Sequence, residues 1–288
     1  MIAHKNIPMR IIIQPCFGRK FSVFLRSDPG LSDGQSPGTR DVDTIARAPG
    51  DATDRAVGAA GGTGMSDSAD VLDTVEVETG ANPRHAVIWL HGLGADGHDF
   101  EPIVPELGLR DLPVRFVFPH APTRPVTINQ GHVMRAWYDI RGLDRQSGQD
   151  EEGIGQSAAQ VEALLRREHD RGIAQGRIVL AGFSQGGAIA LHAGLRQRTP
   201  LAGVMALSTY LPMAERFADE RAPESAGVPV FMAHGTADPV LPVSLGQGSR
   251  DYLQGLGYAI EWHDYPMAHQ VCLEEIRAIA AWLRRVLT

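Results

Sequence analysis

Short apolar runs alternate with amphipathic segments from about residue 71 to the end of the chain. Residues 74–78, TVEVE, alternate polar and apolar side chains with a period of two, which predicts an edge strand. Six later runs are mostly apolar, and such runs are typical of strands buried on both faces. They lie at residues 85–92, 114–119, 177–182, 201–208, 228–235 and 258–265.

Two segments carry apolar residues at helical spacing. The first ends near Arg171 and contains Ile154, Ala158, Val161, Leu164 and Leu165; the second is C-terminal and contains Leu273, Ile276, Ile279, Ala280, Leu283, Val286 and Leu287. Buried strands separated by amphipathic helices predict an α/β fold, with a mostly parallel central sheet flanked by helices on both faces. Two long irregular stretches, 120–153 and 209–226, interrupt the alternation, and loops of this length are often functional.

The first 70 residues have a different composition from the rest. Residues 1–27 contain five basic residues and no acid, whereas residues 28–70 contain eight Asp and no aromatic residue. Such a segment buries too little apolar area to offset the entropy of ordering it. We therefore predict a disordered extension at 1–70, with Met65 as the candidate true start, and a catalytic domain at 71–288. A transit peptide is the competing interpretation of the extension.

The overall composition excludes several classes of protein. The formal net charge of −7 disfavours nucleic acid or an anionic membrane as the main partner. No run approaches 18 apolar residues, so no stable membrane insertion is predicted. The two cysteines, Cys16 and Cys272, cannot build a disulfide framework or a zinc site. Free thiols and a cytoplasmic location are therefore predicted.

The stretch VLAGFSQGGAIAL, residues 179–191, joins a strand directly to a helix through the pattern G-x-S-x-G around Ser184. A nucleophile at such an elbow has strained backbone angles, and the flanking glycines remove side chains that would clash. The following helix directs its amide dipoles at the site and favours negative charge there. The alternative is an ordinary glycine-rich turn with a capping serine.

A serine nucleophile needs a histidine base and a carboxylate that orients the base. Asp238 follows the strand at 228–235, and His269 follows the strand at 258–265. The order Ser184, Asp238, His269 is the one that α/β-hydrolases use.

Other acids and histidines along the chain fit these roles less well. Asp264 is adjacent to the base and is a poor acid, and His263 lies inside a strand, where packing is its expected role. His91 and His234 each precede a glycine at a strand end and are interpreted as shaping the loops there.

Acyl transfer also requires two amide donors for the developing oxyanion. The first is expected from Gln185, the residue after the nucleophile. The second is expected from the glycine-rich loop LHGLGADG, residues 90–97, which follows the run HAVIW, and Leu93 is the candidate. A simple glycine turn is the alternative for this loop.

Six motifs together resemble one known family: LHGLGADGHDF, FVFPHAPTRPVTINQGHVMRAWYDI, LAGFSQGGAIAL, ALSTYLP, HGTADPVLP and YPMAHQV. The sequence is similar to the carboxylesterases and acyl-protein thioesterases of the phospholipase/carboxylesterase family, from about Arg84 to the C-terminus. The resemblance implies an α/β-hydrolase fold without a large cap domain, and hydrolysis of carboxylic esters or thioesters without a metal or cofactor. It assigns nucleophile, acid and base to Ser184, Asp238 and His269, and the oxyanion amides to Leu93 and Gln185.

The predicted function is a carboxylesterase that forms an acyl-enzyme. The alternatives are an acyl-protein thioesterase or lysophospholipase-like activity on longer acyl chains and, least favoured, a non-catalytic binding module. Lactone hydrolases that use a cysteine nucleophile are disfavoured because Ser184 stands at that position.

The predicted substrate is a small ester or acyl thioester, and the long loops are expected to line its pocket. The candidate substrate-binding residues are Met134, Trp137, Tyr210 and Leu211, with Tyr138, Met213 and Phe217 nearby in sequence. Any one of these could equally pack its own loop. Exposed apolar loops could also form a homodimer face, which the sequence leaves open.

Overall fold

The computed structural model describes residues 71–142 and 148–288. Seven strands form one sheet in the order β1-β3-β2-β6-β7-β8-β9. All neighbouring pairs are parallel except β1, which pairs antiparallel with β3 at one edge. The strands are β1 (Thr74–Glu78), β2 (His85–Leu90), β3 (Val114–Pro119), β6 (Ile178–Phe183), β7 (Gly203–Leu207), β8 (Val230–Gly235) and β9 (Ile260–Tyr265).

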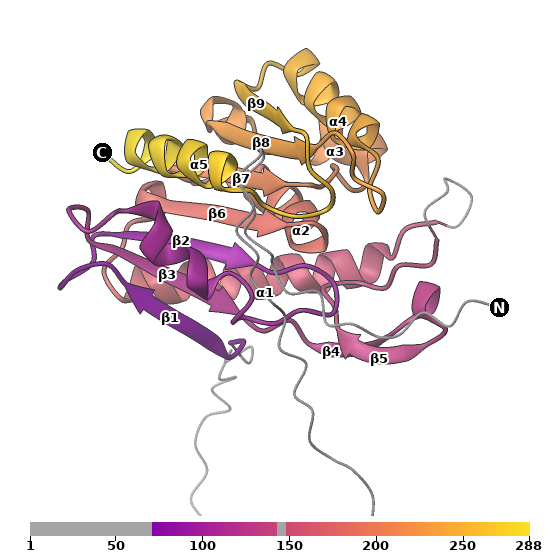
Figure 1. The fold of residues 1–288 in the computed structure, drawn as a ribbon, viewed down its shortest axis with the longest axis horizontal. Helices are drawn as coiled ribbons and strands as arrows, with labels where there is room; N and C mark the ends of the chain where they lie inside the picture. Colours follow the sequence, from indigo (N-terminus) through magenta and orange to yellow (C-terminus); the bar gives the residue numbers. More distant parts are fainter. Residues whose placement is uncertain (1–70, 143–147) are drawn as a thin grey trace, which may run out of the picture. The chain divides into compact units, whose positions relative to one another are not determined.

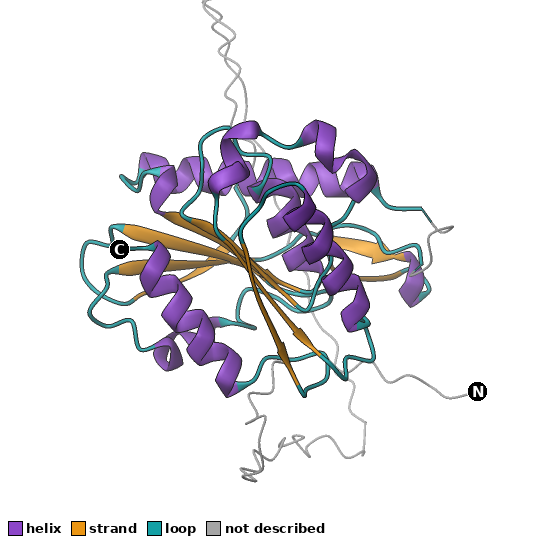
Figure 2. Ribbon diagram, turned by 90° about the horizontal axis from the view of Figure 1, so that it is seen from above, coloured by secondary structure: helices purple, strands orange, loops and turns teal. Residues whose placement is uncertain are grey.

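Helices cover both faces of this sheet, as Figures 1 and 2 show. One face packs against α1 (Glu151–Asp170), α2 (Gln185–Gly194), α3 (Ala214–Glu220) and α4 (Val243–Gly255). The other face packs against α5 (Leu273–Val286) and the 3-10 helix η1 (Glu101–Leu107). The described residues also contain three short 3-10 helices: η2 (Thr127–Asn129), η3 (Gln175–Arg177) and η4 (Pro223–Gly227).

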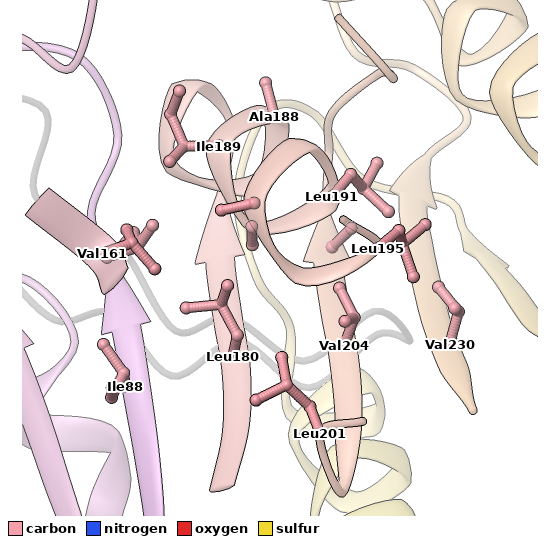
Figure 3. Close-up of a cluster of buried hydrophobic side chains, with 14 of the residues drawn as sticks. Ile88, Val161, Leu180, Ala188, Ile189, Leu191, Leu195, Leu201, Val204 and Val230 are labelled. Atoms are coloured by element: carbon pink, nitrogen blue, oxygen red, sulfur yellow. The ribbon is translucent and has the colours of Figure 1, made fainter. Parts of the chain in front are cut away.

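The core follows from the alternation of side chains along each strand. In β2, Ile88 faces the cluster under α1 and α2, whereas its neighbour Trp89 faces the cluster under η1 and α5. Figure 3 shows the first cluster, in which Leu180 and Val204 from the central strands lie beneath Ala188 and Leu191 of α2. Because these central strands are buried on both faces, the sheet is a rigid platform for the loops at its carboxyl edge.

The predicted α/β-hydrolase fold, with its mostly parallel central sheet, is confirmed, and all seven predicted strands are present. The stretch at 120–153 is more regular than predicted, because β4 (Thr123–Val126) and β5 (His132–Arg135) form a separate antiparallel hairpin there. Between the sheet strands, the described residues hold this hairpin and single helices or short turns, with no large cap domain.

Several predictions fall on residues that the structure does not describe. The extension at 1–70, the Met65 start and the transit-peptide alternative all lie outside the described residues. The prediction of free thiols is wrong for Cys272, which is disulfide-bonded; Cys16 lies outside the described residues. Within the described ranges, no helix combines the length and apolar content needed to cross a bilayer.

Candidate active site

Ser184 lies at a sharp turn between β6 and α2. Its backbone has φ 53° and ψ −119°, a conformation that is costly for a residue with a side chain. The Ser184 N–H donates to Leu207 O (2.9 Å), and the Thr209 hydroxyl donates to Ser184 O (2.7 Å). These bonds from the end of β7 hold the strained turn. All other residues from 178 to 195 are buried, whereas Ser184 is only partly buried.

The glycines around Ser184 allow β6 and α2 to approach each other. A β-carbon on Gly182 would overlap the Gly186 carbonyl, and one on Gly186 would overlap the carbonyls of Leu90 and His91. The Ser184 side chain makes no capping bond to α2, so its hydroxyl remains available to other partners. The close approach therefore accounts for the glycines of the G-x-S-x-G pattern in physical terms.

Three predicted site residues from three different loops meet in one hydrogen-bonded chain. His269 Nε2 lies 2.9 Å from Ser184 Oγ, and His269 Nδ1 lies 2.6 Å from Asp238 Oδ2. The His269 side chain is only 3% exposed, and its ring packs against Phe183 with centroids 4.8 Å apart. Phe183, which directly precedes Ser184 in the chain, thus supports the ring of His269. This geometry fits a nucleophile, a base and an orienting acid.

Asp238 is held by donors on every side. Its Oδ1 accepts from Val240 N–H (2.8 Å) and Leu241 N–H (2.9 Å). His234 Nε2, which donates to Leu241 O at 2.9 Å, lies 3.5 Å from Asp238 Oδ2. Burial raises the pKa of Asp238, but hydrogen bonds from both histidines and from the loop outweigh it and hold the pKa below its usual range. The carboxylate therefore stays ionised beside His269.

The two predicted oxyanion residues lie on either side of the serine. Gln185 is the first residue of α2, where the N–H has no acceptor within the helix. Leu93 follows Gly92, and a β-carbon on Gly92 would lie only 3.5 Å from Ser184 Cβ. The side chain of Gln185 has a role that the sequence did not indicate. Its Oε1 accepts from Trp137 N–H (2.8 Å), and its Nε2 donates to Tyr138 O (2.7 Å).

The predicted substrate-binding residues divide into two groups. Met134 and Tyr210 are partly exposed, whereas Trp137 is fully buried and Leu211 is 4% exposed. The Trp137 indole N–H donates to His91 O at 2.9 Å, so this residue braces the loop after β2. An acyl group would reach Trp137 only after a neighbouring side chain moved.

The other predicted loop residues are also largely buried. Tyr138, Met213 and Phe217 expose 5% or less of their surface. Burial raises the pKa of Tyr138, whose hydroxyl pairs with that of Tyr210 at 3.2 Å.

The positions of the competing aspartate and histidines agree with the structural roles predicted for them. Asp264 is exposed on β9, and His263 packs its ring against Phe231 at 5.1 Å. His91 and His234 are both 1% exposed, and both bind backbone groups of the loops that follow their strands.

The sheet order and the serine elbow together define an α/β-hydrolase, and residues 72–287 match the phospholipase/carboxylesterase family. The chain belongs to this family. It is 41% identical over 235 residues to acyl-protein thioesterase 1 of Mycosarcoma maydis, covering 75% of this chain and 98% of that protein. It is 44% identical over 212 residues to acyl-protein thioesterase 1 of Neurospora crassa, covering 69% and 86%.

Solved structures agree with this assignment. Arabidopsis thaliana SOBER1 superposes with a TM-score of 0.68 and 31% identity, covering 71% of this chain and all of that chain. Acyl-protein thioesterase 2 of Zea mays superposes with a TM-score of 0.65 and 29% identity, covering 75% and 99%. The protein is therefore a hydrolase that acts on esters or thioesters.

Proposed function

We propose that the protein hydrolyses acyl thioesters, with Ser184 as nucleophile, His269 as base and Asp238 as the acid that orients it. The observation that carries this proposal is the chain of two short contacts from Ser184 through His269 to Asp238 at a strained elbow. The names of the relatives support the thioester alternative over the predicted carboxylesterase, because the curated relatives reported above are acyl-protein thioesterases.

The reaction follows from the placement of these groups. His269 Nε2 takes the Ser184 proton as Oγ attacks the carbonyl carbon, and the N–H groups of Leu93 and Gln185 receive the oxyanion. The carbon–sulfur bond breaks, and the departing thiolate takes the proton from His269. Water then repeats the sequence, losing its proton to His269, and Ser184 Oγ leaves with that proton. The products are a carboxylic acid and a free thiol.

The leaving group separates the two substrate classes in physical terms. A thiol has a pKa of about 8.5, well below that of an alkyl alcohol, so a thiolate departs with less help from His269.

We propose that Met134 and Tyr210, the partly exposed pair of the predicted set, contact the acyl chain. A homodimer stays a prediction. A cytoplasmic location also stays a prediction, and it is not supported by free thiols because Cys272 is disulfide-bonded.

A matched pair of substrates tests this proposal. An acyl thioester and an oxygen ester of the same acyl chain would be assayed with wild type and with Ser184→Ala. Hydrolysis of the thioester should exceed that of the ester, and both should fall by several orders of magnitude in the variant. Equal turnover by Ser184→Ala would overturn the mechanism. A consistent preference for the oxygen ester would restore the carboxylesterase interpretation.

A further inference from the structure

The peptide between Gly92 and Leu93 is held from its carbonyl side by the preceding residue. His91 is 1% exposed, and its Nδ1 lies 2.7 Å from Gly92 O. The N–H of Ala95 also donates to Gly92 O, at 3.3 Å. On the other side of the ring, Ala121 N–H donates to His91 Nε2 at 3.0 Å. Both ring nitrogens of this histidine are therefore used by backbone groups.

These two contacts allow one protonation state. A backbone N–H can only donate, so Nε2 must be the bare nitrogen; a carbonyl can only accept, so Nδ1 must carry the proton. Burial lowers the pKa of His91 to about 4, which keeps the ring neutral near pH 7. The ring is thus fixed as the neutral Nδ1–H tautomer, with the proton directed at Gly92 O.

The orientation of the carbonyl determines that of the amide. In a trans peptide the C=O and the following N–H point in opposite directions, so fixing Gly92 O also fixes Leu93 N–H. A β-carbon added to Gly92 would lie 3.5 Å from Ser184 Cβ, so Gly92 lies beside the nucleophile. The Leu93 N–H therefore has a set direction before any substrate arrives. Preorganisation of this kind is what makes an oxyanion donor effective.

A second brace connects the two oxyanion residues. Trp137 donates its indole N–H to His91 O and its backbone N–H to Gln185 Oε1. Gly94 N–H donates to Arg135 O at 2.9 Å, which ties the loop after β2 to the end of β5. The Gly92–Leu93 peptide is therefore held on both sides, at His91 O and at Gly94 N–H, while the His91 ring holds its carbonyl.

We propose that His91 is a positioning residue for transition-state stabilisation, and that its Nδ1–H holds the Gly92–Leu93 peptide with the Leu93 N–H ready for the oxyanion. This inference rests on the proposed function. It assigns a role in the rate to a histidine outside the Ser184–His269–Asp238 chain, and it predicts that the ring donor, rather than the ring's bulk, carries that role.

Two substitutions separate the two ring nitrogens. His91→Asn can place an amide N–H near the Nδ1 position and donate to Gly92 O, but it cannot reach Ala121. His91→Gln can place an oxygen near the Nε2 position and accept from Ala121 N–H, but it does not hold Gly92 O. Removing one oxyanion donor lowers kcat by about 10²–10³, so a donor left in place but misaligned should cost about 10–100-fold.

The readouts distinguish a role in the transition state from a role in folding. For His91→Gln we expect kcat to fall by about 10–100-fold with KM changed less than threefold, and the Ki of a trifluoromethyl ketone analogue to rise in parallel, since its adduct carries the oxyanion. His91→Asn should retain most of kcat. His192→Asn, at a buried histidine far along α2, is the matched control and should retain wild-type kcat.

Two results would overturn the inference. One is a folded His91→Gln variant with kcat within twofold of wild type. The other is an equal loss in both His91 variants that follows their melting temperatures, which would make the role structural. The tautomer has its own readout: ¹⁵N NMR should show His91 protonated on Nδ1 alone at pH 6–8. If Ser184→Ala matches wild type, the proposed function fails; if only His91→Gln matches wild type, the inference alone fails.

Discussion

Replacing Asp238 by asparagine should inactivate the protein without unfolding it. Oδ1 of Asp238 accepts two backbone N–H groups, from Val240 and Leu241. Only an oxygen fits between two donors, so the asparagine oxygen must take this place and its NH₂ must take the place of Oδ2. That NH₂ then faces His269 Nδ1 across the 2.6 Å contact.

The consequence is a change of tautomer. Facing a donor, His269 Nδ1 must accept, so the proton moves to Nε2, the atom that lies 2.9 Å from Ser184 Oγ. A protonated Nε2 cannot take the serine proton. An equivalent substitution in a serine-protease triad lowers kcat about 10⁴-fold, and a loss of about 10³–10⁴ is expected here.

The assay is steady-state hydrolysis of an acyl thioester at pH 7.5, together with a thermal melt. Asp264→Asn is the matched control, because this neighbouring aspartate is exposed on β9 and should be silent. The reasoning would be refuted by a folded Asp238→Asn protein with kcat within tenfold of wild type.

Three further predictions concern stability. Gly182→Ala should lower the melting temperature or prevent folding, because the new β-carbon would overlap Gly186 O. Gly248→Ala, which has open space around it inside α4, should instead raise the free energy of unfolding by about 1 kcal/mol. Thermal melts of the two variants compare these effects. Glu168→Gln should cost about 3 kcal/mol in urea unfolding with kcat unchanged, because this buried carboxylate pairs with arginines on both sides, and an unchanged midpoint would contradict this. Between pH 6.5 and about pH 4, His91 binds a proton in the unfolded chain but stays neutral in the folded chain, because burial lowers its pKa to about 4. The free energy of unfolding should therefore fall, through this histidine, by up to about 1.4 kcal/mol for each pH unit below 6.5. Urea unfolding at pH 7 and at pH 5 should show a smaller loss of stability in His91→Asn than in wild type.

The alternation of apolar and polar residues was enough to predict the sheet, because buried strands and amphipathic helices leave strong local signals. The hairpin β4–β5 left none. Its strands have four residues each, one contains Pro125, and they pair only with each other. The helical pattern of α4 is also weak in the sequence, because Gly246 and Gly248 lie in its interior.

The candidate site divides in the same way. Ser184, Asp238 and His269 each follow a recognisable strand, and carboxyl ends of parallel strands meet at one edge, so chain order predicted their meeting. The braces could not be predicted. An apolar loop residue such as Trp137 has the same pattern whether it lines a pocket or supports a backbone. The tautomer of His91 is set by the N–H of Ala121, 30 residues away, and no local pattern in the sequence indicates that contact.

The most direct test of the central claim is covalent labelling of the resting protein with a fluorophosphonate, followed by peptide mass mapping. This reagent modifies serines that an adjacent base activates. The account predicts one adduct, on the peptide that contains Ser184, with labelling abolished in Ser184→Ala and strongly slowed in Asp238→Asn. Labelling at another residue, or no labelling of a protein that still hydrolyses thioesters, would contradict it.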